Sequence, residues 1–213
     1  MMKTIFPLLA LCLVFLSGCA ITSTSTAKVQ ELAKPYVGIM TLVTDIDTDF
    51  NQLDSATYEQ HIRGKFNNLE NLKYRKHLEK TLARNLEQQQ QVQTRIVKSS
   101  DVFELNANVS YSEFLEKIRA TGVDGILLVN LRNYWYTNDY TTVHFDHVST
   151  TTTDTEPSAV FYTYLLDSQT LHPVWFADSM VQGISAGYDT LHNHLARSIS
   201  RKLRKDKYIM AKY

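Results

Sequence analysis

The apolar positions in the first half of the chain predict alternating strands and helices. The run YVGIMTLV at residues 36–43 is apolar and β-rich, and it predicts a buried first strand. A polar stretch at residues 45–68 follows it. A helix is then predicted by leucines that recur four residues apart, at Leu78, Leu82 and Leu86. The alternation of apolar and polar residues over Val92–Val97 indicates a half-buried strand.

A second helix and a central strand are predicted next. Ser110 and Glu113 form the S-x-x-E pattern of a capping box, and Gly122 stands where a helix C-cap is expected. We therefore expect a helix over residues 111–121. The segment GILLVNL at residues 125–131 is apolar at five of seven positions, which is typical of a strand covered on both faces.

The second half of the chain predicts an antiparallel β section and a last helix. Residues 133–155 are first aromatic and then threonine-rich, and they predict two strands or a long protruding hairpin with its polar tip near residues 149–157. Residues 160–166 and 174–181 predict an antiparallel pair. A helix is expected over residues 188–204, with a buried stripe of Leu191, Leu195, Ile199 and Leu203.

The predicted order of elements is β-α-β-α-β, then an antiparallel β section, then a C-terminal helix. This order favours an α/β class (an α+β mixed sheet) folded as a single three-layer-like domain over residues 34–213. Its roughly 180 residues suffice for one hydrophobic core.

The first 18 residues have the layout of an export signal. Lys3 precedes an apolar run that is too short to span a bilayer comfortably. Residues 16–19, Leu-Ser-Gly-Cys, resemble the lipobox of bacterial lipoproteins, in which the cysteine receives a diacylglycerol and becomes the new amino terminus. The resemblance implies a signal peptide over residues 1–18 and lipidation of Cys19. An ordinary signal peptide with a chance cysteine is the alternative.

Two further features bear on the anchor. Ala20, rather than aspartate, follows Cys19, and by resemblance to the sorting rule of Gram-negative bacteria this favours the periplasmic face of the outer membrane. Several acyl chains on one residue would hold the protein stably in a lipid bilayer. The sequence ITSTST at residues 21–26 has no apolar periodicity, so we expect a flexible tether over residues 19–33.

Composition narrows the chemistry of the mature domain. Cys12 lies in the discarded segment and Cys19 carries the lipid, so the domain keeps no thiol for a disulfide, a cysteine-ligated metal or a nucleophile. The chain has 22 basic and 22 acidic residues, a balance that gives no indication of nucleic-acid binding. We expect no cofactor.

Three segments carry a resemblance to known domains: the strand VGIMTLV, the junction TGVDGILLVNL at residues 121–131 and the hairpin YLLDSQTLHPVW at residues 164–175. They resemble a group of bacterial periplasmic domains that includes the amino-terminal domain of the Tol translocation protein, the curli-secretion lipoprotein and the lipoprotein that activates penicillin-binding proteins. Asp167, Thr170 and Trp175 match the hairpin pattern of that group, whereas Leu171 stands where a glycine is expected. The resemblance implies a domain that binds other envelope proteins and is not an enzyme.

A serine hydrolase is the competing hypothesis. Residues 183–187 read G-x-S-x-G between a strand and a helix, and Asp189, His192 and His194 follow Ser185. Only 26 residues remain after Gly187, however, too few for the strand–helix units that return an acid and a histidine to the serine. We therefore expect no catalytic residues.

The histidines also raise the question of a metal site. His144, Asp146 and His147 lie close together in sequence, but on a strand His147 would oppose the other two. His192 and His194 point in different directions on a helix. We expect no metal site, and ordinary exposed histidines instead.

The aromatic residues of the antiparallel section are the candidate for binding a partner protein. Alternation along strands sends half of such side chains to the core and leaves the others on a surface. The candidates are Tyr134, Trp135, Tyr136 and Tyr140.

Basic residues gather in the last segment, between Arg197 and Lys212, as expected near a helix C-terminus. We expect a binding or assembly factor for another envelope component, with a subunit of a secretion or pore assembly as a further alternative.

Overall fold

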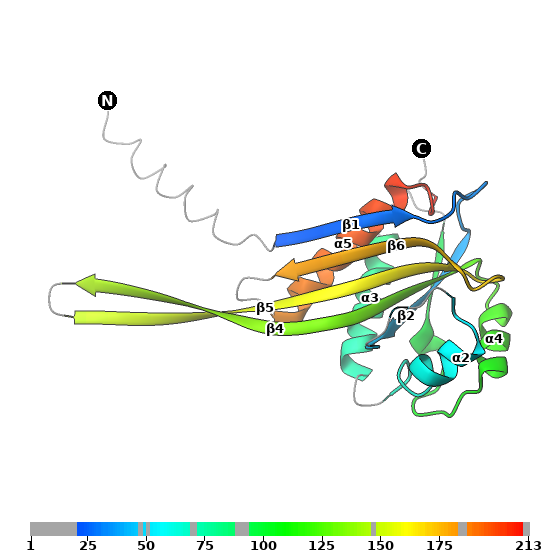
Figure 1. Ribbon diagram of the computed structural model, residues 1–213, viewed down its shortest axis with the longest axis horizontal. Coiled ribbons are helices and arrows are strands. Elements are labelled where there is room, and N and C mark those ends of the chain that lie inside the picture. Colours follow the sequence, from blue (N-terminus) through cyan, green and yellow to red (C-terminus); the bar gives the residue numbers. More distant parts are fainter. Residues whose placement is uncertain are drawn as a thin grey trace.

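The computed structural model describes residues 21–46, 49, 52–68, 72–87, 94–145, 148–182 and 187–210. Its centre is a six-stranded mixed sheet with the strand order β1-β6-β5-β4-β2-β3 (Figure 1). The strands are β1 (Ile21–Lys28), β2 (Gly38–Thr44), β3 (Arg95–Lys98), β4 (Gly125–Phe145), β5 (Val148–Asp167) and β6 (Pro173–Gln182). The helices are α2 (Ser55–Thr57), the π-helical turn η1 (Tyr58–Ile62), α3 (Leu72–Glu87), the 3-10 turn η2 (Ser99–Asp101), α4 (Tyr111–Ala120) and α5 (Gly187–Lys205).

The sheet is parallel where helices connect its strands and antiparallel elsewhere. β2 pairs parallel with β3 and with β4, whereas β4, β5 and β6 form an antiparallel series. The predicted mixed α/β class is thereby confirmed, with β4 inside the sheet as expected. In the part of the chain that the structure describes, no helix is both long and apolar enough to cross a membrane.

Helices cover both faces of the sheet, which gives three layers. On one face, α3 and α5 bury their leucine and isoleucine stripes against β2, β4, β5 and β6. On the other face, η1 and α4 pack against a second core, at the end of the sheet where β2 and β4 begin (Figure 1). The stripe that was predicted for the last helix is fully buried, at Leu191, Leu195, Ile199 and Leu203.

Helix α4 begins and ends at the predicted signals. The Oγ of Ser110 accepts a hydrogen bond from the backbone N–H of Glu113 at 3.3 Å, as expected for an N-cap. After Thr121 the chain turns at Gly122, whose φ of 65° lies in the left-handed region that a glycine adopts without strain.

The stretch at residues 45–68 is more ordered than its polar composition predicts. Asp54 caps α2 by accepting a hydrogen bond from the backbone N–H of Thr57 at 2.7 Å. Besides Ile46, four apolar side chains of the stretch are fully buried in the second core, namely Leu53, Tyr58, Ile62 and Phe66. They are spaced four or five residues apart among polar neighbours, so they form one face of two short helical turns and give no longer periodic signal.

Residues 21–28 overturn part of the predicted tether. They form β1, which pairs antiparallel with β6 along its whole length. The Oγ1 of Thr24 donates to Ser179 Oγ at 3.2 Å and accepts from Ser198 Oγ of α5 at 2.7 Å. The sequence lacks an apolar pattern, but β-branched threonine suits a strand, and its hydroxyl pairs with hydroxyls on neighbouring elements. The prediction of a flexible tether over residues 19–33 is therefore wrong for these residues.

The turn between β5 and β6 contains Leu171 at the position where a glycine is expected. Leu171 has a φ of 58°, so the backbone at this position has the conformation that favours glycine. Asp167 organises the turn, because its Oδ1 accepts hydrogen bonds from the backbone N–H groups of Gln169 and Thr170 at 3.0 and 2.9 Å. The side chain of Leu171 is buried in the second core, which offsets the backbone strain.

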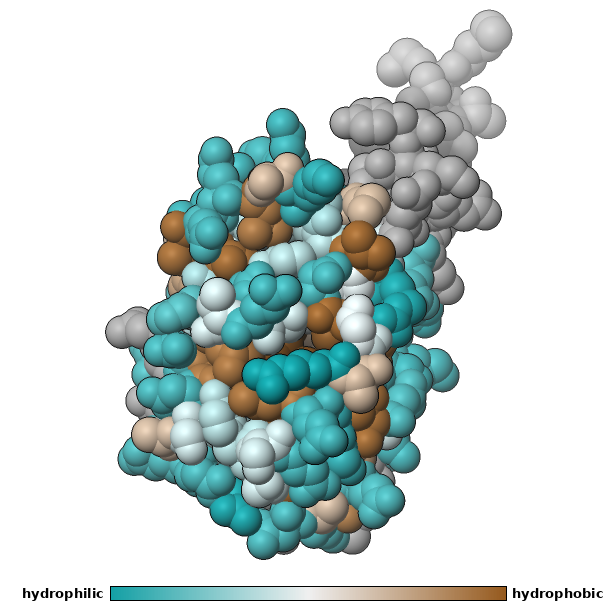
Figure 2. Space-filling model, turned by 90° about the vertical axis from the view of Figure 1, so that its right-hand side faces the viewer, coloured by the Kyte–Doolittle hydropathy of each residue, from teal (hydrophilic) through white to brown (hydrophobic). Residues whose placement is uncertain are grey.

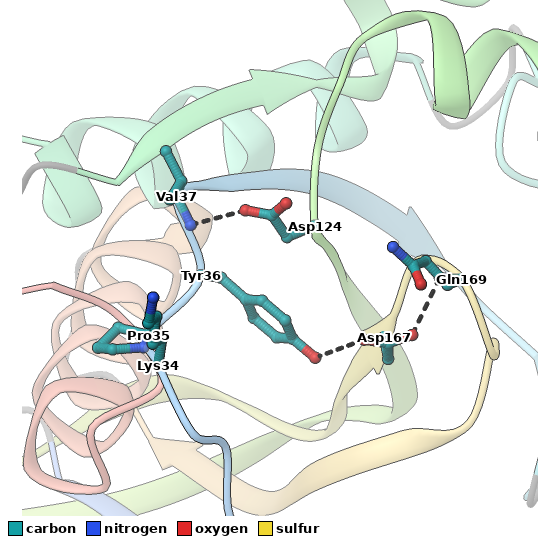
Figure 3. A pocket seen from close by; sticks show the side chains of 7 residues that line it. All are labelled: Lys34, Pro35, Tyr36, Val37, Asp124, Asp167 and Gln169. Atoms are coloured by element: carbon teal, nitrogen blue, oxygen red, sulfur yellow. Dashed lines mark hydrogen bonds between the residues drawn. The ribbon is translucent and has the colours of Figure 1, made fainter.

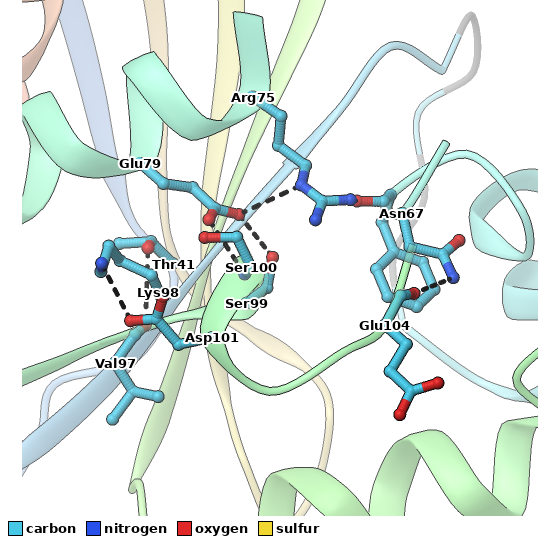
Figure 4. A network of polar contacts seen from close by, with 11 residues as sticks. Thr41, Asn67, Arg75, Glu79, Val97, Lys98, Ser99, Ser100, Asp101 and Glu104 are labelled. Atoms are coloured by element: carbon cyan, nitrogen blue, oxygen red, sulfur yellow. Dashed lines mark hydrogen bonds and ion pairs between the residues drawn. The ribbon is translucent and has the colours of Figure 1, made fainter. Parts of the chain in front are cut away.

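A buried charged network fastens α3 to the chain around it (Figure 4). Glu79 and Arg75 are 0% and 2% exposed, and Arg75 Nε lies 3.8 Å from Glu79 Oε1. Glu79 also accepts hydrogen bonds from Ser99 Oγ and from the backbone N–H of Ser100. Burial raises the pKa of Glu79, against the opposing effect of these hydrogen bonds and of Arg75. Arg75 in turn donates to the carbonyl of Phe66, so both charges have partners inside the fold.

Candidate interaction surface

The two longest strands of the sheet continue well past their neighbours. β4 pairs with β2 only as far as Asn130, and β5 pairs with β6 only from Ser158 onward. The pairing between β4 and β5 nevertheless continues to Phe145 and Val148. Residues 133–145 and 148–157 thus form a two-stranded ribbon that protrudes from the body of the molecule (Figure 1). Its outer edges have no neighbouring strand in the described part of the chain, so their backbone groups can pair with another strand.

The ribbon confirms a protruding hairpin but corrects the place of its tip. The tip was expected near residues 149–157, yet the strands stay paired until only residues 146 and 147 separate them. Thr142 Oγ1 and Thr151 Oγ1 lie 3.0 Å apart across the strands, and Thr155 Oγ1 donates to Asn138 Oδ1 at 2.9 Å. Polar threonines therefore extend the strands here, because a β-branched side chain favours the extended backbone.

The predicted aromatic residues divide between the two faces of the ribbon. Tyr134, Tyr136 and Tyr140 share the face on the α5 side, since side chains alternate along a strand. Tyr134 packs partly against the core, and its ring meets that of Tyr136 edge to face with centroids 5.2 Å apart. Tyr136 and Tyr140 are 57% and 69% exposed. Trp135 lies on the opposite face and is half-buried.

The ribbon lacks the basic residues, lysine above all, that usually protect open strand edges. No lysine or arginine occurs between Asn133 and Ala196, whereas Asp139, Asp154 and Glu156 lie on the ribbon. Exposed edges in soluble proteins are commonly protected by lysine, which disfavours the addition of another strand. This composition leaves the edges suited to backbone pairing with a partner.

A second group of side chains lies at the base of the ribbon, on the face away from α5. Arg132 stacks over the ring of Tyr162 at 5.0 Å, and Tyr162 contacts Phe176 edge to face with centroids 5.5 Å apart. Met180 on β6 is 43% exposed. Sequence reasoning missed Arg132, Phe176 and Met180, because only the register of β5 against β6 brings them together.

Cys19 and the serine motif lie outside the described residues, apart from Gly187 at the start of α5. The acid and the first histidine that were considered for a hydrolase contact α3 instead. Asp189 Oδ1 lies 3.1 Å from His77 Nε2, and His192 Nδ1 lies 2.7 Å from His77 Nδ1. Both groups therefore join α5 to α3.

His192 is not the exposed histidine that was expected. It is 1% exposed and packs edge to face against Tyr74, with ring centroids 4.7 Å apart. Burial, together with the neighbouring His77, lowers its pKa to about 4, although Asp189 acts in the opposite direction. Among the other candidate ligands, His144 is exposed on the ribbon, and Asp146 and His147 lie outside the described residues. The described residues contain no cluster suited to a metal ion.

A cavity of about 320 Å³ lies at the end of the sheet opposite the ribbon (Figure 3). The two carboxylates that line it already accept hydrogen bonds from residues 36–38. Asp124 accepts hydrogen bonds from the backbone N–H groups of Val37 and Gly38 at 2.8 and 3.1 Å, and Asp167 accepts one from the Tyr36 hydroxyl at 3.2 Å. Burial, and then the charge of Asp167, raise the pKa of Tyr36. The cavity therefore reflects how the start of β2 is attached rather than a ligand site.

No protein-family model and no curated protein matches this sequence. The structure is similar, at low identity, to solved structures of bacterial proteins. The PelC dodecamer from Paraburkholderia phytofirmans is 13% identical with a TM-score of 0.47, and the match covers 88% of this chain and 98% of that one. Lipoprotein GNA1162 from Neisseria meningitidis is 13% identical with a TM-score of 0.37, over 79% and 99% of the two chains. A minor lipoprotein from Acinetobacter baumannii is 10% identical with a TM-score of 0.32, over 83% and 98%. Each TM-score is below 0.5, so the function proposed next is inferred from the residues of this chain.

Proposed function

We propose that this chain is a lipoprotein anchored to the periplasmic face of the outer membrane, and that its domain is a non-enzymatic binding or assembly factor for another envelope component. The ribbon is the observation that carries the proposal. A free two-stranded ribbon is only marginally stable in water, and open edges and exposed tyrosines are groups that partners bind. The proposed binding residues are Tyr134, Trp135, Tyr136 and Tyr140.

The anchor in this proposal is Cys19. Its position directly after an apolar export signal supports acylation, and Ala20 supports the outer membrane as the destination. Replacement of Cys19 by serine is expected to abolish acylation and, with it, the cleavage that makes residue 19 the amino terminus. A Cys19→Ser protein that still incorporates a labelled fatty acid, or that is still cleaved before residue 19, would contradict the anchor.

The binding role can be tested by crosslinking in intact cells. A photoreactive amino acid at Tyr140 on the ribbon is expected to capture a defined envelope component, which mass spectrometry then identifies. The matched control places the same group at Val37, which is 58% exposed at the opposite end of the sheet. The ribbon is not the binding surface if Tyr140 captures nothing or if both positions capture the same set of molecules.

The open edges also favour a second candidate, a subunit of a secretion or pore assembly. Copies of the chain could add strand to strand along the ribbon, because neither edge carries a lysine or arginine. Native mass spectrometry of the acylated protein distinguishes the two functions. A closed ring supports the assembly subunit, whereas a stable monomer supports the binding factor.

A further inference from the structure

Only a very short segment connects the proposed lipid anchor to the first strand of the domain. Ile21 is the first residue of β1, and only Ala20 separates it from Cys19. Two residues span at most about 7 Å, whatever their conformation. A tether that continued to residue 33 would instead have reached about 45–50 Å. Acylation of Cys19, which belongs to the proposed function, would therefore attach the lipid directly to one corner of the sheet.

That corner is part of a row of residues that crosses the sheet to the base of the ribbon. Ile21 is the register partner of Gln182, Gln182 of Ser158, and Ser158 of Trp135. Three steps of about 4.8 Å between neighbouring strands place Trp135 about 14 Å from Ile21. The Cα of Cys19 therefore lies within about 21 Å of every backbone position in this row.

The side chains at this level of the sheet suit the headgroup region of a bilayer. Trp135 is half-buried on the face away from α5. Met180 is 43% exposed on the same face as Trp135. Tryptophan and tyrosine are favoured at the interface between lipid and water, because their rings join an apolar body to a polar group. Two carboxylates lie close by: Glu156 accepts a hydrogen bond from the Gln182 amide at 2.9 Å, and Asp178 lies two residues before Met180 on the same face of β6.

We propose that acylated Cys19 holds this row of the sheet at the bilayer surface, so that Trp135 and Met180, on the face away from α5, contact phospholipid headgroups. The inference rests on the proposed acylation of Cys19. It assigns Trp135 at the base of the ribbon to lipid, and it leaves Tyr136, Tyr140 and the open edges for a protein partner. The face that α5 covers then points away from the membrane. Figure 2 shows the end of the molecule opposite the ribbon, where apolar side chains lie among a hydrophilic surround.

The chain contains only two tryptophans, which makes the contact measurable by fluorescence. Trp135 is at the base of the ribbon, whereas Trp175 is 0% exposed and donates to Asp206 at 2.9 Å. The acylated protein is bound to phosphatidylethanolamine vesicles, with or without phosphatidylcholine brominated on the acyl carbons nearest the headgroup. Bromine quenches tryptophan only at short range, so the emission of the wild type is expected to fall in brominated vesicles. Trp135→Phe, which keeps Trp175, is expected to show no fall.

A second variant tests whether the short connection positions the row. A flexible glycine–serine segment inserted between Ala20 and Ile21 leaves acylation and folding intact and is expected to abolish most of the quenching. Arg132, on the same face at the base of the ribbon, already stacks over Tyr162 and lies 3.9 Å from Asp49 Oδ1, so added salt is expected to leave the quenching of the wild type unchanged.

The outcomes separate the anchor from the contact. A wild-type protein that is not acylated and stays in solution would overturn the proposed anchor and the inference together. A protein that binds vesicles but is not quenched, or whose quenching survives either Trp135→Phe or the inserted segment, would overturn the inference alone.

Discussion

His192 couples its protonation state to the packing of α5 on α3. Its Nδ1 lies 2.7 Å from that of His77, and such a contact requires one ring to donate and the other to accept. A proton on both facing nitrogens would break it. The sequence shows a histidine in a helix, but it does not show that a second histidine, more than 100 residues away, faces it across the helix interface.

This coupling predicts a loss of stability in acid. The ordinary pKa of histidine is 6.5, and in the folded protein that of His192 is about 4, so the unfolded chain binds the extra proton first. The stabilisation is complete above pH 6.5 and is lost as the pH falls toward 4. Over this range the wild type is expected to lose about 3 kcal/mol of its free energy of unfolding, and the His192→Phe variant is expected not to show this loss. Urea unfolding at a series of pH values measures both.

The control for this prediction is His172→Gln, because His172 is an exposed residue in the turn between β5 and β6. It is expected to leave the pH dependence as in the wild type. An acid-dependent loss that is equally large in the His192→Phe variant would show that other groups cause it.

At the scale of elements, the sequence predicts best where one local signal decides the structure. The cap at Ser110 and the stripe of α5 were confirmed because each depends on neighbours within one helix. β1 was missed because Thr24 is held by hydroxyls of β6 and α5, which are distant in sequence, and residues 53–66 were missed because two short turns carry little periodicity. Similarly, the tip of the ribbon was misplaced because polarity was taken as the sign of a turn.

At Leu171, in the turn between β5 and β6, we expect glycine to be a more stable substitution than alanine, which is the reverse of the usual order. Both Leu171→Ala and Leu171→Gly remove a buried side chain, at a cost of about 2–4 kcal/mol. Only glycine also relieves the backbone strain of a φ of 58°. We therefore expect Leu171→Gly to be about 1 kcal/mol more stable than Leu171→Ala in denaturant unfolding.

An exposed helical position provides the matched comparison. At Ser112 on α4, alanine is expected to be the more stable of the two substitutions, by about 1 kcal/mol. If alanine is the more stable residue at both positions, the positive φ of Leu171 does not strain the turn.

At the scale of the whole molecule, the sequence predicted the layers, the presence of a protruding hairpin and, apart from β1 and the turns at residues 53–66, the order of elements. It could not predict that both edges of the ribbon stay open, because that depends on where β2 and β6 end relative to β4 and β5. The partition of the aromatic residues between two faces likewise required the register shift between Leu131 and Asn133.

The body of the protein is expected to fold without the outer part of the ribbon. Replacement of residues 140–153 by Asn-Gly closes the strands at the Asp139–Asp154 pair with a tight turn. None of the removed residues belongs to either core. The midpoint of thermal unfolding, followed by circular dichroism, should therefore change by no more than about 2 °C, while capture of a partner is lost. A large fall in the midpoint would instead make the ribbon part of the folding unit.

The pairing of β1 with β6 also determines when the sheet can be completed during folding. The first strand of the domain finds its partner only after β6 has been made, because the register joins Ile21 to Gln182. Contacts that are so distant in sequence form late in folding. During export the segment beside Cys19 would therefore remain unpaired and accessible to the acylating and sorting enzymes, and the sheet would take it up only when almost the whole chain has crossed the membrane. The proposed anchor, although it adjoins a strand that is paired in the folded protein, is in this way compatible with its own processing.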